Sequence, residues 1–205
     1  MQSNGKVITW LGIFFLVLGW SAWNPHDYPT WWLEVLPAIV ALLVLALTRK
    51  RFPLTPLVYW LILVHAVILM VGGHYTYAEV PLGDWVMQWT GGSRNNYDKL
   101  GHFAQGFVPA MVAREILVRK QVVAKRGWLS PIVVSICLAI SAFYELIEWW
   151  VALLSGEAAE AFLGTQGYAW DTQSDMFLAL IGAVIALLLL SGLHDRQLLN
   201  LEKDR

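Results

Sequence analysis

Three pairs of ionisable residues in the second half of the chain have both the helical spacing and the chemistry of a polar site. They are Asp98 with His102, Glu145 with Glu148, and Asp171 with Asp175. The members of each pair are three or four residues apart, so on an α-helix they share one face. Carboxylates and imidazoles bind divalent ions such as Mg²⁺, Mn²⁺, Zn²⁺ or non-haem iron, and they also act as general acids and bases. The spacing therefore predicts a site wherever these helix faces meet.

The elements that carry these pairs are apolar enough to lie in a membrane. The chain of 205 residues is 58% hydrophobic and 14% charged, whereas a soluble domain has about 25% charged residues. This composition excludes a disordered chain, a nucleic-acid-binding protein and an ordinary soluble domain. The single cysteine excludes a disulfide framework and a cysteine-based zinc cluster. Six stretches approach the roughly 20 apolar residues that cross a bilayer, namely residues 7–23, 31–48, 54–73, 98–118, 129–154 and 172–193.

The basic residues predict how these six spans are oriented. If the amino terminus is inside, all of the 14 basic residues except Arg94 and Lys99 fall on inner segments, as the positive-inside rule requires. We expect the first span to be retained, because the residues after it form a poor signal-peptide cleavage site. Short connections favour antiparallel neighbours. The sequence therefore predicts an all-α integral membrane protein, with residues 1–205 forming one compact six-helix domain and both termini cytoplasmic.

The helical rise places the three pairs at one depth. Counted from the outer ends of their spans, His102 lies roughly 7 Å and Asp175 roughly 6 Å deep, while Glu145 lies roughly 24 Å from the inner surface of a core about 30 Å thick. All three therefore lie near the outer face. Carboxylates crowded together cannot all stay ionised. Protons, a divalent cation or Lys99, whose direction the spacing leaves open, must balance them.

Each of these acids also has a structural interpretation. Asp98 and Asp171 begin helices, where aspartate is a favoured N-cap. Glu145 and Glu148 lie near the carboxyl end of their helix, where the helix dipole disfavours anions, so capping does not explain them. Their structural alternative is to pair with Lys99, and that of Asp175 and His102 is a hydrogen bond within the bundle. We expect Glu34 to be an ordinary helix-start acid. We expect Asp84 to be an interfacial acid and His65 to be a packing or hydrogen-bonding residue. The long connections 74–97 and 155–170 are either covers of the site or ordinary interfacial connections.

Three sequence blocks resemble those of a known family of membrane proteins. They are Tyr97–Gly106 (YDKLGHFAQG), Tyr144–Trp149 (YELIEW) and Gly164–Phe177 (GTQGYAWDTQSDMF). Together they resemble the YjdF-type inner membrane proteins over essentially the whole chain, and more faintly the VanZ-like membrane proteins. The resemblance implies the architecture, a location in a bacterial inner membrane and a shared polar set, but no reaction. That set is Asp98, Lys99, His102, Glu145, Asp171 and Asp175, while Tyr168 and Ser174 depart from the family pattern, which has an acid and a tryptophan there.

Three functions compete for this site. The first is a metal-dependent enzyme acting on a lipid or envelope precursor of the outer leaflet, with Glu148 as general base and Lys99 contacting an anionic headgroup. Its candidate ligands are His102, Glu145, Asp171, Asp175 and Asp98. The second is a proton- or cation-coupled transporter, because acids and histidines in spans mark such pathways. The third is a scaffold whose polar cluster only holds the helices together.

Overall fold

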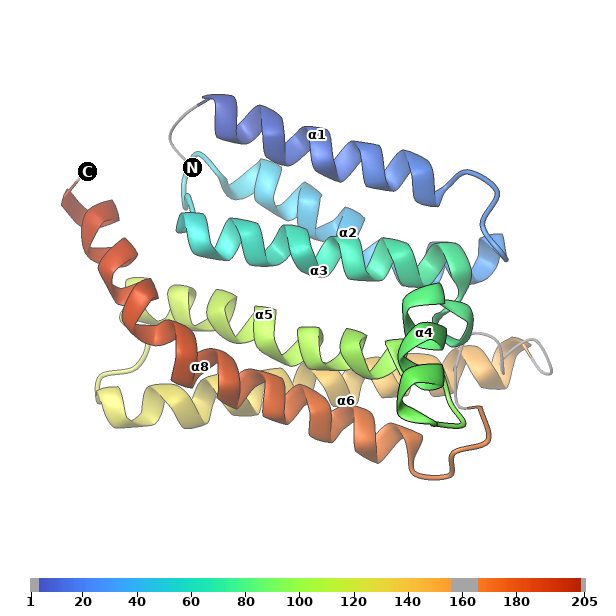
Figure 1. The fold of residues 1–205 in the computed structure, drawn as a ribbon. Helices are drawn as coiled ribbons and strands as arrows, with labels where there is room; N and C mark the ends of the chain where they lie inside the picture. Colours follow the sequence, from blue (N-terminus) through green and yellow to red (C-terminus); the bar gives the residue numbers. More distant parts are fainter. Residues whose placement is uncertain (1–3, 156–165, 204–205) are drawn as a thin grey trace.

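The computed structural model describes residues 4–155 and 166–203, and every regular element within these ranges is helical. In chain order the elements are α1 (Asn4–Ser21), α2 (Tyr28–Thr48), α3 (Pro56–Tyr75), η1 (Tyr77–Glu79), α4 (Pro81–Thr90), α5 (Tyr97–Arg119), η2 (Arg126–Trp128), α6 (Leu129–Ser155) and α8 (Asp171–Lys203). The long helices run side by side in one bundle, and α1 begins at the end of the bundle where α8 finishes (Figure 1). The predicted all-helical fold is therefore confirmed.

Five of the described helices are long and apolar enough to cross a membrane. They are α1, α2, α3, α6 with its leading turn η2, and α8. Helix α5, at the position of the predicted span 98–118, is 23 residues long but more polar than the others. It packs against α3, α6 and α8, so its charged side chains face other helices. Charged groups within a membrane are found in such positions because protein partners replace water there.

Helices α5 and α8 approach closely because glycines occupy both sides of their contact. A Cβ atom added at Gly106 of α5 would lie 1.8 Å from the carbonyl oxygen of Ala179. In the opposite direction, a Cβ atom at Gly182 of α8 would lie 2.2 Å from the carbonyl oxygen of Phe103. Small residues of this kind allow backbones of membrane helices to touch. The contact fixes the register of α5 against α8 just below the polar pairs.

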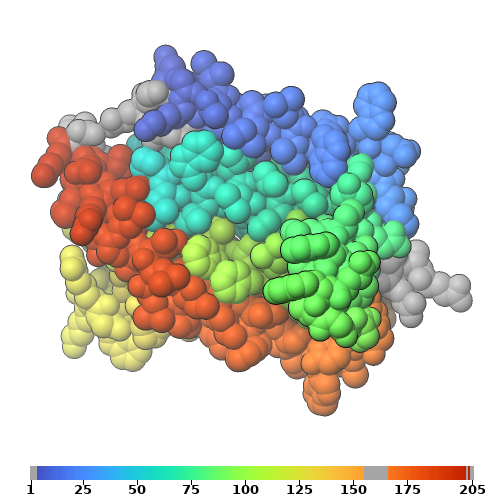
Figure 2. Space-filling view, in the orientation of Figure 1, coloured from blue at the N-terminus to red at the C-terminus, as the bar shows by residue number. Residues whose placement is uncertain are grey.

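The outer surface of the bundle is apolar along its length. Leu47, Leu154 and Leu188 are each more than three-quarters exposed, which suits helices surrounded by lipid rather than water. On the inner side of α1, the indole nitrogen of Trp10 donates to the carbonyl oxygen of Tyr59 at 2.8 Å. Short helix α4 lies over one end of the bundle, on the face shown in Figure 2.

Candidate functional site

The structure brings the three predicted pairs together at one end of the bundle. Asp98, Lys99 and His102 lie in the first turns of α5, Glu145 and Glu148 lie in the outer part of α6, and Asp171 and Asp175 begin α8. The ring nitrogens of His102 lie within 4.0 Å of carboxylate oxygens from α5, α6 and α8. The helix faces inferred from spacing therefore meet, while the chemical roles assigned to them stay predictions.

The α8 side of the cluster is neutralised by cations of the chain itself. Lys99 Nζ lies 2.5 Å from Asp171 Oδ1 and 2.6 Å from Asp175 Oδ1, and it donates to Ser174 Oγ at 2.7 Å. Arg94 Nη1 lies 2.7 Å from Asp171 Oδ1. Buried carboxylates bind the nearest cation in this way because water is not available to solvate them. These ion pairs compete with the metal-binding role predicted for Asp171 and Asp175 and with the headgroup contact predicted for Lys99, and both roles stay predictions.

The two departures from the family pattern lie beside this cation. Ser174 accepts the hydrogen bond from Lys99, and its own hydroxyl donates to the Asp171 carbonyl oxygen at 2.9 Å. The ring of Tyr168 lies 5.6 Å from the Arg94 guanidinium and 5.7 Å from Lys99 Nζ. Aromatic faces attract cations at this range. Both substitutions are therefore compatible with the ion pairs that hold α5 to α8.

The α6 side of the cluster contains two buried atoms without partners. His102 Nε2 lies 3.2 Å from Asp98 Oδ1, so a proton on Nε2 leaves the Nδ1 lone pair facing α6. Nδ1 lies 3.7 Å from Glu145 Oε1, too far for a hydrogen bond, and neither atom has another partner. A carboxylate behind one imidazole nitrogen and a free lone pair on the other is how proteins orient a metal-binding histidine.

Two overlapping sets of side chains have the spacing of a metal site. One contains His102, Glu145 and Glu148, the other contains Asp98, His102 and Asp175, and in each set the ligand atoms lie within 4.8 Å of one another. The second set is already engaged, because Asp98 contacts the histidine and Asp175 contacts Lys99. The first set keeps the two unpartnered atoms, so it fits a cation better.

The site has more acids than cations. Six carboxylates lie around it, those of Glu34, Asp98, Glu145, Glu148, Asp171 and Asp175. In the described part of the chain, the lysine and arginine that pair with them are Lys99 and Arg94. With His102 neutral, an excess of negative charge is left in a mostly buried place. Protons or a bound cation must balance it.

A cavity of about 220 Å³ adjoins the cluster, and Glu34 is one of the residues that line it. Glu34 was expected at a helix start, but Asp27 caps α2, so Glu34 lies two turns inside and faces the cavity, 4% exposed. The prediction for Glu34 is therefore wrong. Its carboxyl interacts with the phenols of Tyr77 and Tyr144. Burial raises the pKa of Tyr77, so this phenol keeps its proton and is a donor for Glu34.

The two histidines of α3 take different roles. His65 lines the cavity together with Gln105, and its expected role as a packing or hydrogen-bonding residue stays a prediction. His74 lies away from the cluster, with Nδ1 3.1 Å from the carbonyl oxygen of Ser21 and its ring against Trp20. It therefore ties α3 to α1. The two histidines are nine residues apart, which places them on opposite faces of the helix, so both cannot face the site.

The connection between α4 and α5 is held in place by hydrogen bonds. Asn95 is buried and its side-chain nitrogen donates to the Val80 carbonyl oxygen at 2.9 Å and to Asp84 Oδ1 at 2.7 Å. Gln166 forms hydrogen bonds with both the backbone nitrogen and the carbonyl oxygen of Asn95. The connection is thus fastened at Asn95. Of the second predicted cover, 155–170, residues 156–165 lie outside the described part of the chain.

A second polar network at the opposite end of the bundle was not foreseen as a unit. Glu115 accepts hydrogen bonds from the backbone and hydroxyl of Thr55, from Arg119 and from His194. The other His194 nitrogen lies 2.9 Å from Arg114. His194 was not predicted to take part because it follows the expected span 172–193, whereas α8 continues ten residues further, to Lys203. This network joins α3, α5 and α8, and its polar atoms have partners.

Apolar helices around buried polar clusters define a multi-spanning membrane protein. The chain belongs to the family of predicted membrane proteins DUF2238, whose family model matches residues 7–196. It is 57% identical over 183 residues to the inner membrane protein YjdF of Escherichia coli strain K12. That alignment covers 89% of this chain and 88% of the relative, so the resemblance seen in the three sequence blocks is confirmed. No solved structure matches the chain.

Proposed function

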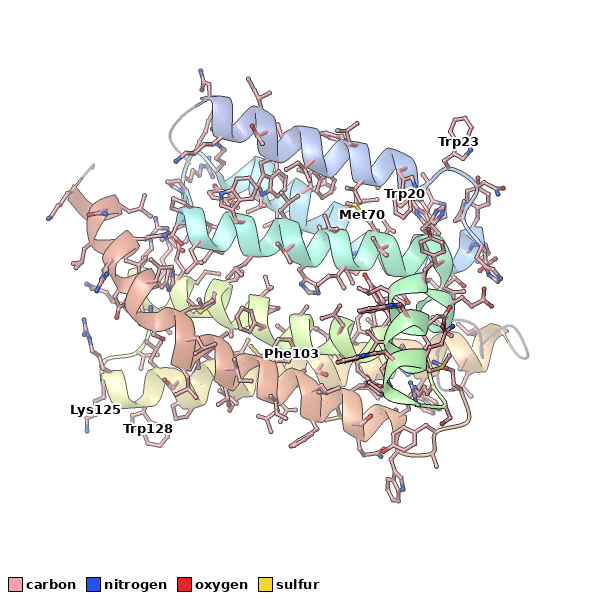
Figure 3. All side chains as sticks on the ribbon, viewed as in Figure 1. Trp20, Trp23, Met70, Phe103, Lys125 and Trp128 are labelled. Carbon is pink, nitrogen blue, oxygen red and sulfur yellow. The ribbon has the colours of Figure 1, made fainter. Side chains whose placement is uncertain are left out.

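We propose that the chain crosses the inner membrane six times, with α5 as the fourth span and both termini in the cytoplasm. Support comes from the ends of the bundle: Lys125 lies at the end opposite Trp20 and Trp23 (Figure 3), and basic residues favour the cytoplasmic side while tryptophans favour interfaces. The polar site then faces outward. Cysteine labelling in a Cys137→Ser background tests this. Ser93→Cys should react with an impermeant maleimide in intact cells, and Gln121→Cys only after permeabilisation, whereas the reverse result contradicts the orientation.

We further propose that His102 and Glu145 hold a divalent cation in a membrane-embedded enzyme, with Glu148 beside the cation as general base. The observation that carries this proposal is the pair of unpartnered, buried atoms His102 Nδ1 and Glu145 Oε1, 3.7 Å apart. Two ligand atoms bound to one tetrahedral ion at about 2.1 Å lie about 3.4 Å apart. A small side-chain adjustment would therefore let both atoms bind one ion. The bound charge would also offset the surplus of carboxylates around it.

The chemistry open to such a centre is hydrolysis or group transfer on a lipid or envelope precursor. A divalent cation polarises a phosphoryl or carbonyl oxygen. Glu148, within 4.8 Å of the two ligand atoms, is placed to accept a proton from an attacking water or hydroxyl group. Lys99 and Arg94 act as positioning residues in this proposal, because they hold α8 and Asp171 against α5. The outward position of the site points to a substrate of the outer leaflet.

Metal analysis of the purified protein tests the proposed centre. After loading with Mg²⁺, Mn²⁺, Zn²⁺ or Fe²⁺ and removal of excess ion, we expect about one ion per chain and a higher unfolding temperature. His102→Ala and Glu145→Gln should lose both effects. Glu79→Gln is the matched control, because this acid is exposed and pairs with His26 away from the site. Absence of a stoichiometric ion in the wild type, or its retention in both site variants, contradicts the proposal.

One observation favours a second candidate, a proton- or cation-coupled transporter. The cavity continues from the cluster to His65 of α3 and Gln105 of α5, both of them polar groups within helices. Beyond these residues the core is apolar, with Val58, Met111 and Val133 buried, so the enzyme is the better supported proposal. Cation-driven flux into liposomes that disappears with Glu148→Gln would favour the transporter instead.

A further inference from the structure

The cavity beside the polar site is elongated along the bundle. On α5 it is lined by Asp98, His102 and, further along, Pro109. Asp98 and Pro109 are 11 residues apart, which corresponds to about 16 Å along a helix, or roughly half of a 30 Å hydrocarbon core. The cavity thus begins at the charged cluster and ends at the depth of the bilayer centre.

The cavity wall becomes less polar along this length. The cluster end is formed by Glu34, Asp98, His102 and Glu148. The far end includes the apolar side chains of Pro37, Leu69, Pro109 and Ile140, together with the polar side chains of His65 and Gln105. Proline inside a helix removes the donor for a carbonyl one turn earlier, so Pro109 also frees the carbonyl oxygen of Gln105. The lining therefore matches an amphiphile with its polar group at the cluster and its chain toward the bilayer centre.

The apolar end of the cavity reaches the lipid-facing surface between α2 and α6. Ile140 lines the cavity and is also 41% exposed. On α2, Pro37 lines the cavity. Its neighbours on the same helix, Leu36 and Val40, are about half exposed, so this part of α2 also reaches the surface. Helix α2 packs mainly on α3, and α6 packs on α5 and α8; both lie behind α3 and α5 in Figure 1. The mouth is therefore bordered by two helices that belong to different halves of the bundle.

We propose that a phospholipid-like substrate enters this cavity sideways from the bilayer, between α2 and α6. Its phosphate would reach the centre formed by His102, Glu145 and Glu148, and its chain would lie against Leu69, Pro109 and Ile140. This inference rests on the proposed metal centre, since carboxylates such as Glu34 and Asp98 would repel a phosphate without a cation. It narrows the substrate from any envelope precursor to one that carries a phosphate on a membrane-anchored chain.

The size of the cavity agrees with partial rather than complete enclosure. Pockets that enclose a drug-sized ligand measure about 300–1,000 Å³, whereas this cavity measures about 220 Å³. A headgroup phosphate and the first part of one chain fit that volume, and the rest of the lipid must stay in the bilayer. A mouth open to lipid, as at Ile140, is what such a ligand requires.

Photolabelling tests the sideways entry. The full-length protein, loaded with Mn²⁺ in phosphatidylcholine vesicles, is irradiated with phosphatidic acid that carries a diazirine in its acyl chain, and labelled peptides are mapped by mass spectrometry. We expect label on Leu69 and Pro109 in the wild type. Ile140→Trp should fill the mouth and reduce this label at least five-fold, whereas Phe143→Trp, on the exposed face of the same helix, should leave it unchanged. Ile140→Phe is a milder second variant, with protection of Cys137 from a thiol reagent as the check on folding.

The outcomes separate the cavity from the metal centre. Label confined to outward residues, or equal label in Ile140→Trp and Phe143→Trp, overturns the sideways entry even where the protein binds a stoichiometric ion. If the ion is absent but label on Leu69 and Pro109 still depends on Ile140, the entry route stands and the proposed metal centre fails. A chelator should reduce labelling by phosphatidic acid and not by a matched diacylglycerol. Equal responses of these two probes overturn the assignment of the phosphate to the centre.

Discussion

Replacing Gly106 by alanine should separate the two helices that carry most of the polar site. The added Cβ atom would lie 1.8 Å from the Ala179 carbonyl oxygen and 2.5 Å from its carbonyl carbon. Ordinary contacts of a Cβ atom begin near 3.4 Å, so the backbones must part by about 1.5 Å. Since the obstacle is backbone and not the end of a flexible side chain, no rotamer change relieves it.

The cost follows from what this separation disturbs. Overpacking a core typically costs about 1–3 kcal/mol. The same shift lengthens the contacts of Lys99 Nζ with Asp171 and Asp175, now 2.5 and 2.6 Å, so we expect the upper end of that range. For a chain of this length, about 3 kcal/mol corresponds to a fall in unfolding temperature of roughly 6–12 °C.

The buried cysteine provides the assay. Cys137 is fully buried and is the single cysteine of the chain, so a fluorogenic maleimide reports unfolding in detergent as the thiol becomes accessible. The matched control is Gly19→Ala in α1, where an added Cβ atom meets nothing within 4 Å. Alanine in a helix interior is favoured over glycine by about 0.5–1 kcal/mol, so this control should unfold at the wild-type temperature or slightly above it.

The reasoning is refuted if Gly106→Ala and Gly19→Ala unfold at the same temperature. Such a result would mean that α5 and α8 do not approach closely at Gly106. The contacts of Lys99 and His102 with α8 would then be wrong as well. If Gly106→Ala lowers the unfolding temperature but leaves the metal content unchanged, the helix contact is supported. The proposed metal centre would then not depend on that contact.

Three further stability predictions concern other contacts of the buried polar groups. Lys99→Met should destabilise the fold by about 3–5 kcal/mol, because it leaves buried carboxylates without their cation; adding Asp175→Asn should recover part of the loss, and additive losses in this double-mutant cycle would contradict the pairing. Glu115→Ala should cost a similar amount, against under about 1 kcal/mol for Asp195→Asn, whose side chain is 54% exposed; equal unfolding temperatures would count against the second network. Asn95→Ala removes the hydrogen bonds to Val80, Asp84 and the Tyr97 backbone, so it should lower the free energy of unfolding by about 1–3 kcal/mol. The control Asn96→Ala, at an exposed position, should change it little. Equal unfolding temperatures of the two variants would show that Asn95 does not hold this connection in place.

Sequence spacing predicted the helix faces because periodicity alone decides which side chains share a face. It placed His102, Glu145 and Asp175 together correctly, since each lies one to three turns from the helix end at the same end of the bundle: the amino-terminal ends of α5 and α8 and the carboxyl end of α6. It could not decide where Lys99 points, because a long flexible side chain chooses its partner from residues of another helix. Those partners, Asp171 and Asp175, follow in the sequence after more than 70 residues, so their distance from Lys99 depends on tertiary packing.

The misplacement of Glu34 has a local cause that the sequence does contain. Apolar length was used to begin the span at Trp31, but Asp27 followed by Pro29 is a helix-start signal. In the structure Asp27 accepts a hydrogen bond from the Thr30 nitrogen at 2.8 Å, so α2 starts one turn earlier. Given that start, Glu34 becomes an acid inside a helix, which by the rule for charges in spans needs a partner. Capping residues were therefore the better guide than hydropathy at this boundary.

The two polar networks of the molecule distinguish a structural role from a functional one. Both oxygens of Glu115 accept hydrogen bonds, and both ring nitrogens of His194 have partners within 3.0 Å, as expected of groups that hold helices together. At the other end of the bundle, His102 and Glu145 are also buried, 5% and 7% exposed, yet each keeps an atom without a hydrogen-bond partner. Leaving such atoms unpaired costs free energy. A chain that satisfies one buried Glu–His pair fully has no structural need to leave the other open, so the open pair is where a ligand is to be sought.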